Sequence, residues 1–231
     1  MQGYFTPDER LQQKEKFDEH YRHMQSWGIR EGKAFRWLKD VPRDARILEC
    51  GSGSGCFSQQ LIQAGFTNVH QSDFDDYVVY PEVRALNRFT KADLSFDRLP
   101  FDDNSFDFVI ALQVLEHVEN SWHAVREFKR ILKNNGRCII SVPNADALPA
   151  RMCFLFYHSP DPNHLPTNSD VNFFIPDLLH RLFGKGWHHD WTDYSTSFIK
   201  LSKKIKIRFP DKRWINKIFA RRIAFGFTKN S

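Results

Sequence analysis

Residues 46–55 are Arg-Ile-Leu-Glu-Cys-Gly-Ser-Gly-Ser-Gly, a short apolar run that stops at a loop with glycine at every second position. The apolar run predicts a buried strand, and the one-sided apolar pattern of residues 56–64 predicts a helix directly after it. Glycine lets a ligand approach the backbone of such a turn, because no Cβ is in the way. The stretch therefore indicates an α/β fold with a ligand at this turn; the alternative is a tight turn without a ligand.

Strands and helices alternate along the rest of the chain. Further strands are predicted at residues 68–72, 106–112, 137–142 and 223–228, and further helices at 121–132 and 176–183. Strands that are apolar almost throughout are typical of a parallel sheet with helices on both faces. Residues 134–136 predict a turn. Residues 144–172 lose all periodicity, which indicates a long loop of the kind that is often functional.

We therefore expect one domain over residues 1–231. It would comprise a helical N-terminal segment at 1–40, a core at 41–197 and a basic C-terminal segment with the terminal strand at 198–231. Hydrophobic residues make up 41% and charged residues 26% of the sequence, which excludes disordered and collagen-like chains. No stretch approaches the roughly 18 apolar residues of a membrane-spanning helix, and the N-terminus lacks the pattern of a signal peptide.

The four cysteines and the charge distribution bear on location and partners. The cysteines lack the paired spacing of a metal site, so we expect free thiols and a cytoplasmic protein. Residues 198–231 hold eleven bases and one acid, a net +10, which leaves −5 for residues 1–197. Residues 200–222 mix these bases with apolar side chains, and an amphipathic helix is predicted at 214–222. Three alternatives are open for the basic face of this helix. It is only solvated, it contacts an anionic membrane surface and so makes the protein membrane-peripheral, or it contacts nucleic acid.

The glycine loop differs from the dinucleotide fingerprint Gly-x-Gly-x-x-Gly, which places a pyrophosphate at the helix N-terminus. Cys56 stands where that pattern needs its last glycine. A nucleoside without phosphates, such as S-adenosylmethionine, needs only close backbone approach. Asp73 ends the second predicted strand 22 residues after Gly51 and can accept both ribose hydroxyls. Asp93 can accept the adenine amine while Leu94 packs on the ring; the alternative for both aspartates is an ordinary solvated turn residue.

Four segments in order, residues 47–55, 99–109, 114–118 and 132–144, resemble the class I S-adenosylmethionine-dependent methyltransferases. The resemblance implies a Rossmann-like, doubly wound sheet of seven strands, mostly parallel, with the last strand inserted antiparallel. It implies that the loop glycines line the methionine and ribose portions, that the glutamate before them orients the loop or the donor's ammonium, and that the backbone after the fourth strand faces the methionine tail. The residues so assigned to the donor are Glu49, Gly51, Gly53, Gly55, Asp73, Asp93, Leu94, Leu112 and Gln113.

The donor's methyl group is activated as a sulfonium, so the protein must align a nucleophile at about 3 Å and exclude water. A general base assists an oxygen or nitrogen nucleophile, and histidine suits that role near pH 7. The candidates are His117, after the fourth strand, and His158 and His164 on the long loop; the alternative for each is a histidine without a catalytic role. Adjacent histidines at 188–189 would point to opposite faces of a strand, so no metal site is expected.

The expected function is methyl transfer to an oxygen or nitrogen atom of a small metabolite, or of a lipid- or glycan-linked intermediate. One alternative is an RNA or protein methyltransferase that docks its substrate through residues 200–222. The other is a non-catalytic module that binds an adenosyl ligand, because a fold alone does not prove chemistry.

Overall fold

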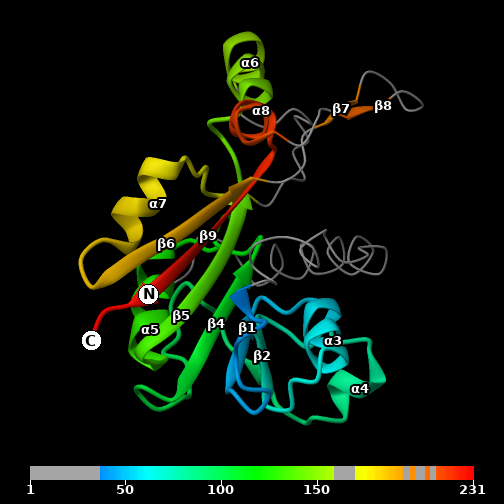
Figure 1. The fold of residues 1–231 in the computed structure, drawn as a ribbon, viewed down its shortest axis with the longest axis vertical. Helices are drawn as coiled ribbons and strands as arrows, with labels where there is room; N and C mark the ends of the chain where they lie inside the picture. Colours follow the sequence, from blue (N-terminus) through cyan, green and yellow to red (C-terminus); the bar gives the residue numbers. More distant parts are fainter. Residues whose placement is uncertain (1–36, 159–169, 195–197, 201–205, 209–211) are drawn as a thin grey trace.

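The computed structural model describes residues 37–158, 170–194, 198–200, 206–208 and 212–231 (Figure 1). Seven strands form one sheet in the order β3-β2-β1-β4-β5-β9-β6. They are β1 (Ile47–Cys50), β2 (Val69–Asp73), β3 (Phe89–Lys91), β4 (Phe106–Leu112), β5 (Leu132–Pro143), β6 (Trp187–Tyr194) and β9 (Arg222–Lys229). β1 to β5 pair in parallel, and β9 lies antiparallel between β5 and β6. The predicted Rossmann-like sheet with an antiparallel last strand is confirmed.

Two apolar clusters cover the two faces of this sheet. Alternate strand residues belong to different clusters: Ile47 and Phe108 pack with α3 (Cys56–Gln63), whereas Leu48 packs with α5 (Ser121–Ile131) and α7 (Pro176–Phe183). Successive side chains of a strand point to opposite faces, so a strand covered on both sides is apolar almost throughout. Packing on both faces of the sheet therefore explains why the predicted strands are apolar almost throughout.

The predicted turn at residues 134–136 lies inside β5. Phe106 of β4 pairs with Leu132 and Phe108 with Arg137, so the residues between these partners bulge out of the ladder. Asn135 has a φ of 61°, and a Cβ on the residue after it would lie 2.8 Å from the carbonyl oxygen of Lys133. The turn is therefore real, but it interrupts a strand instead of preceding one.

The prediction of an unbroken loop at 144–172 is wrong, because residues Leu148–Tyr157 form α6. Their side chains are apolar almost throughout, so the segment has no helical periodicity to detect. Pro149 stands in the first turn of α6, where a proline is tolerated. Residues 159–169 of the predicted loop, including His164, lie outside the described residues.

The C-terminal segment also differs from the expectation. The predicted helix at 214–222 is α8 (Arg213–Phe219), which ends where the chain turns into β9. Strands β7 (Phe198–Lys200) and β8 (Lys206–Arg208) form a separate antiparallel pair that the sequence did not indicate. A short helix, α4 (Pro81–Arg84), follows β2. Almost all of the helical segment predicted at 1–40 lies outside the described residues.

Two expected absences can be examined in the described part of the chain. None of its helices has the length and apolar content needed to cross a membrane. Its histidines, cysteines and acids form no group of three or more that could hold a metal ion. All four cysteines are free thiols, as expected, and Cys50 and Cys138 are buried in strands.

Candidate functional site

The carboxyl ends of the parallel strands meet at one edge of the sheet, and the strand order reverses between β1 and β4. Ligands of open α/β sheets bind in the crevice at such a reversal. Gly51 follows β1, Asp73 ends β2, Asp93 follows β3, and Gln113 follows β4. The fold thus brings the predicted donor residues from four strands to one edge.

Left-handed backbone shapes the loop after β1. The φ angles of Gly51, Gly53 and Gly55 are 67°, 49° and 80°, which favour glycine. A Cβ on Gly51 would lie 2.3 Å from Cγ2 of Val114, so the segment after β4 packs directly on this glycine. The backbone N–H of Gly51 donates to the carbonyl oxygen of Ser72 at 2.7 Å, which ties the loop to the end of β2.

Asp73 fixes the other side of the loop. Its Oδ2 accepts a hydrogen bond from the Gly53 N–H at 2.7 Å, and its Oδ1 accepts one from the Phe74 N–H at 2.7 Å. Burial raises the pKa of this carboxyl to about 6, although the two N–H groups oppose the shift. A carboxylate oxygen has two lone pairs, so each Asp73 oxygen can still accept a ribose hydroxyl.

Glu49 lies beneath the loop and is only 4% exposed. Its Oε2 accepts hydrogen bonds from both the N–H and the hydroxyl of Ser58 in the first turn of α3. Burial raises the pKa of Glu49 to about 8, and the bonds from Ser58 oppose this rise. At neutral pH the side chain is therefore mostly protonated, and it holds the loop against α3 as a neutral group.

A hydroxyl in the loop provides a test of whether the site fits an adenosyl donor. The Oγ of Ser52 is buried and has no hydrogen-bond partner in the part of the chain that the structure describes. Leaving such a group without a partner costs about 1–3 kcal/mol, so it indicates a missing polar ligand or water. The amino-acid and ribose groups of S-adenosylmethionine supply such partners, and the three glycines leave room for them. The residues present therefore fit this donor.

The turn after β3 holds the predicted adenine residues. The Oδ1 of Asp93 accepts a hydrogen bond from the Ser95 N–H at 2.9 Å, and the Asp93 N–H donates to Asp97 at 2.8 Å. Leu94 is buried among the apolar residues beside α5. These contacts fix both side chains in place, and their role toward adenine stays a prediction.

The backbone at Leu112 and Gln113 lies between the glycine loop and β5. Gln113 has a φ of 57°, which is uncommon for a residue other than glycine. Its N–H donates to the Ser141 carbonyl oxygen at 2.8 Å, and its Nε2 donates to the Ser141 hydroxyl at 3.2 Å. Strained backbone that is held in this way is typical of functional sites.

His117 follows this backbone and contacts a distant part of the chain. Its Nδ1 lies 3.2 Å from Oδ1 of Asp170, and both side chains are half-buried. The carbonyl oxygen of Glu116 accepts hydrogen bonds from Val171 and Asn172 at 2.8 and 3.0 Å. The segment at 170–172 is thereby clamped onto the residues after β4, and its aspartate orients the imidazole.

Glu116 lies beside this pair and is 1% exposed. Burial raises its pKa well above the usual range, Asp170 adds to the rise, and Arg222 opposes it. Its Oε2 has no hydrogen-bond partner within the described residues. Neither Glu116 nor Asp170 was predicted as a site residue. The position of Glu116 directly before His117 is a signal that could have identified it. No local sequence pattern marks Asp170.

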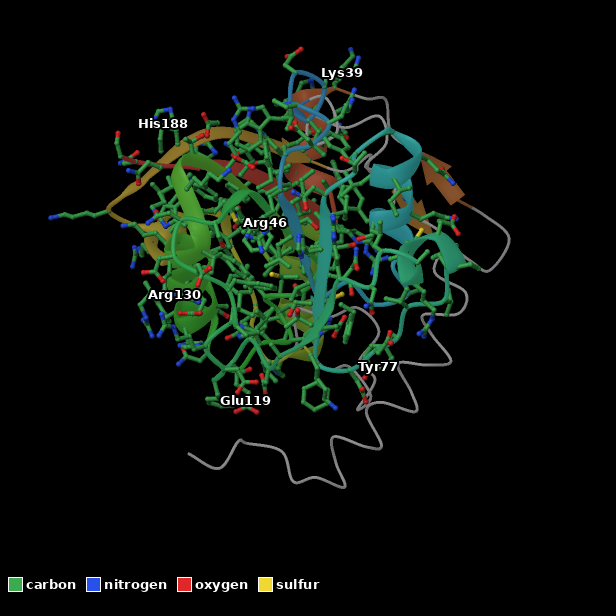
Figure 2. All side chains as sticks on the ribbon, turned by 90° about the horizontal axis from the view of Figure 1, so that it is seen from below. Lys39, Arg46, Tyr77, Glu119, Arg130 and His188 are labelled. Carbon is green, nitrogen blue, oxygen red and sulfur yellow. The ribbon has the colours of Figure 1, made fainter. Side chains whose placement is uncertain are left out.

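The remaining candidate histidines lie elsewhere. His158 is exposed and ends α6 with a φ of 58°. His188 pairs with Thr228 near the start of β6, at the edge opposite the carboxyl ends of the parallel strands. Figure 2 shows His188 far from Glu119, which follows the segment of His117.

Known proteins share both the sequence and the fold of this region. Residues 48–140 match the family model described as a methyltransferase domain. An uncharacterised protein of Methanocaldococcus jannaschii is 36% identical over 110 residues, which cover 46% of this chain and 44% of that protein. The 27-O-demethylrifamycin SV methyltransferase of Amycolatopsis mediterranei is 27% identical over 126 residues, which cover 46% of this chain and 42% of that enzyme. The chain thus spans less than half the length of these curated relatives.

The likeness of fold extends over nearly the whole chain. A protein of Haloferax volcanii, solved in complex with the Trm112 methyltransferase activator, matches with a TM-score of 0.66 at 17% identity, and the match covers 95% of this chain and 97% of that one. The segment that matches the family model runs from β1 to β5 and contains the glycine loop, Asp73 and His117. A protein of Mycobacterium tuberculosis that is 34% identical over 104 residues, which cover 42% of this chain and 35% of that protein, is named a probable S-adenosylmethionine-dependent methyltransferase. Residues 48–140 therefore match the methyltransferase domain, and the fold of the chain is that of the class I S-adenosylmethionine-dependent methyltransferases.

Proposed function

We propose that this chain transfers the methyl group of S-adenosylmethionine to an oxygen or nitrogen atom of a small acceptor, either a free metabolite or a lipid- or glycan-linked intermediate, with His117 as general base. The observation that carries this proposal is the His117–Asp170 pair, which lies just after the strand end that packs on the donor loop. The donor supplies an activated methyl group, so the protein's tasks are to hold both partners, exclude water and remove a proton.

The distance along the chain from donor loop to base is short. Val114 packs on Gly51, and the His117 N–H donates to the Val114 carbonyl oxygen at 2.9 Å. One turn of chain therefore joins the residue that contacts the loop to the imidazole. The glycine loop, Ser52, Asp73 and the backbone at 112–113 are the groups that would hold the donor.

Asp170 is proposed as a positioning residue. A carboxylate near one imidazole nitrogen orients the ring and stabilises the cation that forms when the imidazole takes a proton from the acceptor. The name of the Amycolatopsis relative describes methylation at an oxygen atom of a small molecule, which supports a small acceptor here.

We expect His117→Gln to lower kcat by about 100-fold or more, since general bases contribute about 10²–10⁴-fold. Donor affinity, measured by titration calorimetry, should stay within about twofold because the base does not hold the donor. Asp170→Asn should lower kcat with unchanged donor affinity and unchanged unfolding temperature. His158→Gln, at an exposed site, is the matched control; an equal loss in this variant would contradict the role of His117.

The acceptor class is tested by incubating the protein and a tritiated methyl donor with cell extract, and then separating small molecules, lipids, RNA and protein. Label in the small-molecule or lipid fraction that depends on His117 would support the proposal. Label confined to RNA or protein would establish the alternative of a macromolecular acceptor. Absence of donor binding in calorimetry would overturn the enzymatic function altogether.

A further inference from the structure

The helix that the sequence did not predict, α6, exposes an apolar stripe. Leu148, Met152, Leu155 and Phe156 are spaced so that they share one helical face, and all four are exposed. Leu155 and Phe156 are each 66% exposed. The apolar face of a helix in a folded domain normally packs against the core. On α6 this face is turned to the outside.

Helix α8 extends the exposed apolar surface. Trp214 and Ile218 lie one helical turn apart and are exposed, whereas Ile215 is buried. The helices α6 and α8 contact each other, and Figure 1 shows them together beyond the end of β5. We name the exposed apolar side chains of these two contacting helices the α6–α8 face. It consists of Leu148, Met152, Leu155 and Phe156 of α6 with Trp214 and Ile218 of α8.

The α6–α8 face is attached firmly to the sheet. The backbone N–H of Asn144, just after β5, donates to the Arg221 carbonyl oxygen at 2.9 Å. The Asn144 side chain donates to the Ala220 carbonyl oxygen at 3.0 Å. One buried residue therefore joins the chain that enters α6 to the chain that leaves α8, and the face has a fixed position relative to the sheet.

Exposed basic side chains occur on and next to the same two helices. Lys212, Lys217 and Arg221 are exposed on and beside α8, and Arg151 is exposed on α6. Asp146 is the one acid in residues 145–158 and 212–222, and Arg151 pairs with it. The charge around the apolar side chains is therefore positive.

We propose that the α6–α8 face is a docking surface for an anionic membrane. Helices that lie in a membrane interface combine large apolar side chains with lysine and arginine, and tryptophan is enriched at the interface. Contacts with nucleic-acid phosphates are made by lysine and arginine side chains, so exposed leucine, methionine and isoleucine side chains have no role in them. An anionic membrane suits both parts of this composition. The apolar side chains would be buried among lipid chains, and the basic side chains would be attracted to acidic headgroups.

The position of the face has a consequence for the site. Because β5 runs parallel to β1 and β4, α6 begins at the edge that carries the donor loop and His117. Docking through α6 and α8 would place this edge next to lipid headgroups. This placement would favour a lipid-linked acceptor. That consequence rests on the proposed function, but the docking proposal is independent of it.

The docking is tested by co-sedimentation of the full chain with phosphatidylcholine vesicles, with and without phosphatidylglycerol. We expect sedimentation with the anionic vesicles only, and less of it at high salt. The double variant Leu155→Ser/Phe156→Ser and the double variant Lys212→Glu/Lys217→Glu should each weaken vesicle binding about tenfold or more. Trp122→Ser and Arg126→Glu, at exposed sites on α5, are the matched controls and should bind as wild type does.

Several results would overturn the docking proposal. They are failure to sediment with anionic vesicles, equal losses in the α5 controls, or retention on RNA that the serine variants leave unchanged. A wild-type dimer in sedimentation velocity that the serine variants convert to monomer would assign the face to a second copy of the chain. Donor binding by calorimetry should be the same in all variants, so a failure of docking is separate from a failure of the proposed methyl transfer.

Discussion

At the scale of single residues, Gly51 carries two requirements that can be separated by experiment. Its φ of 67° is left-handed, and a Cβ there would lie 2.3 Å from Val114. Gly65 has a φ of 93°, but its nearest neighbour, Arg43, would lie 3.8 Å from a Cβ. We expect Gly65→Ala to cost about 1–2 kcal/mol of unfolding free energy through backbone strain alone. Gly51→Ala should cost more and should also weaken donor binding about tenfold or more, because it displaces the donor loop.

Urea unfolding and calorimetry with S-adenosylmethionine measure these two effects. Equal unfolding free energies for the two alanine variants would show that the contact with Val114 is unimportant. Donor affinity in Gly51→Ala equal to that of wild type would contradict the placement of the donor on this loop.

Glu49 makes stability depend on pH in a direction that its environment fixes. Its pKa is about 8 in the folded protein, above the ordinary value of 4.5, because the carboxyl is buried. The folded state therefore keeps a proton that the unfolded state has lost, and the free energy of unfolding falls as pH rises from about 4.5 to about 8. The free energy of unfolding falls by at most about 1.4 kcal/mol per pH unit through this group.

The variant Glu49→Gln removes this titration but keeps an oxygen that can accept the bonds from Ser58. We expect its unfolding free energy, measured by urea titration at pH 5, 6, 7 and 8, to fall less steeply than that of wild type. Glu82 is the control: the hydrogen bond from Gln59 lowers the pKa of its carboxyl, so Glu82→Gln should keep the wild-type slope above pH 5. A Glu49→Gln slope equal to that of wild type would show that this buried carboxyl is not protonated in the folded state.

At the scale of elements, the pairing of β6 with β9 depends on a glycine that faces an indole ring. Gly226 lies opposite Trp191, and a Cβ on it would lie 2.2 Å from the Trp191 Nε1. We expect Gly226→Ala to destabilise the protein by about 1–3 kcal/mol, the usual cost of overpacking. In the Trp191→Phe background the smaller ring leaves room for the methyl group, so the same substitution should cost less there. Additive effects in urea unfolding of the two single variants and the double variant would contradict this contact.

The elements that the sequence predicted correctly are those with a clear apolar pattern between recognisable ends. β4 runs over Phe106–Leu112, as predicted, and α7 begins at a proline and ends before Gly184, as predicted. α6 escaped prediction because an exposed apolar face leaves no contrast between its two sides. β7 and β8 have three residues each, too few for a pattern of alternation.

Site residues, like helices and strands, could be predicted only where a local sequence pattern marks them. The predicted donor residues follow strands, and the parallel sheet brings them to one edge. Asp170 reaches His117 only because residues 170–172 return to the segment after β4, and this contact has no trace in local sequence. The basic C-terminal segment was recognised by its charge, but its apolar partner α6 lies far away in sequence.

At the scale of the whole molecule, the proposed donor site joins the ends of β1, β2 and β4, so donor binding should stabilise the entire sheet. A ligand at about 100 times its Kd that binds only the folded state adds about 2.7 kcal/mol to the free energy of unfolding. For a chain of 231 residues this corresponds to a rise in Tm of about 5–10 °C. We expect S-adenosylhomocysteine to produce such a rise in wild type and a smaller one in Asp73→Ala. NAD at the same concentration should produce none, because Cys56 replaces the glycine that a pyrophosphate site needs. A rise with NAD equal to that with S-adenosylhomocysteine would mean that the loop binds phosphates after all, and an equal rise in Asp73→Ala would remove Asp73 from the donor site.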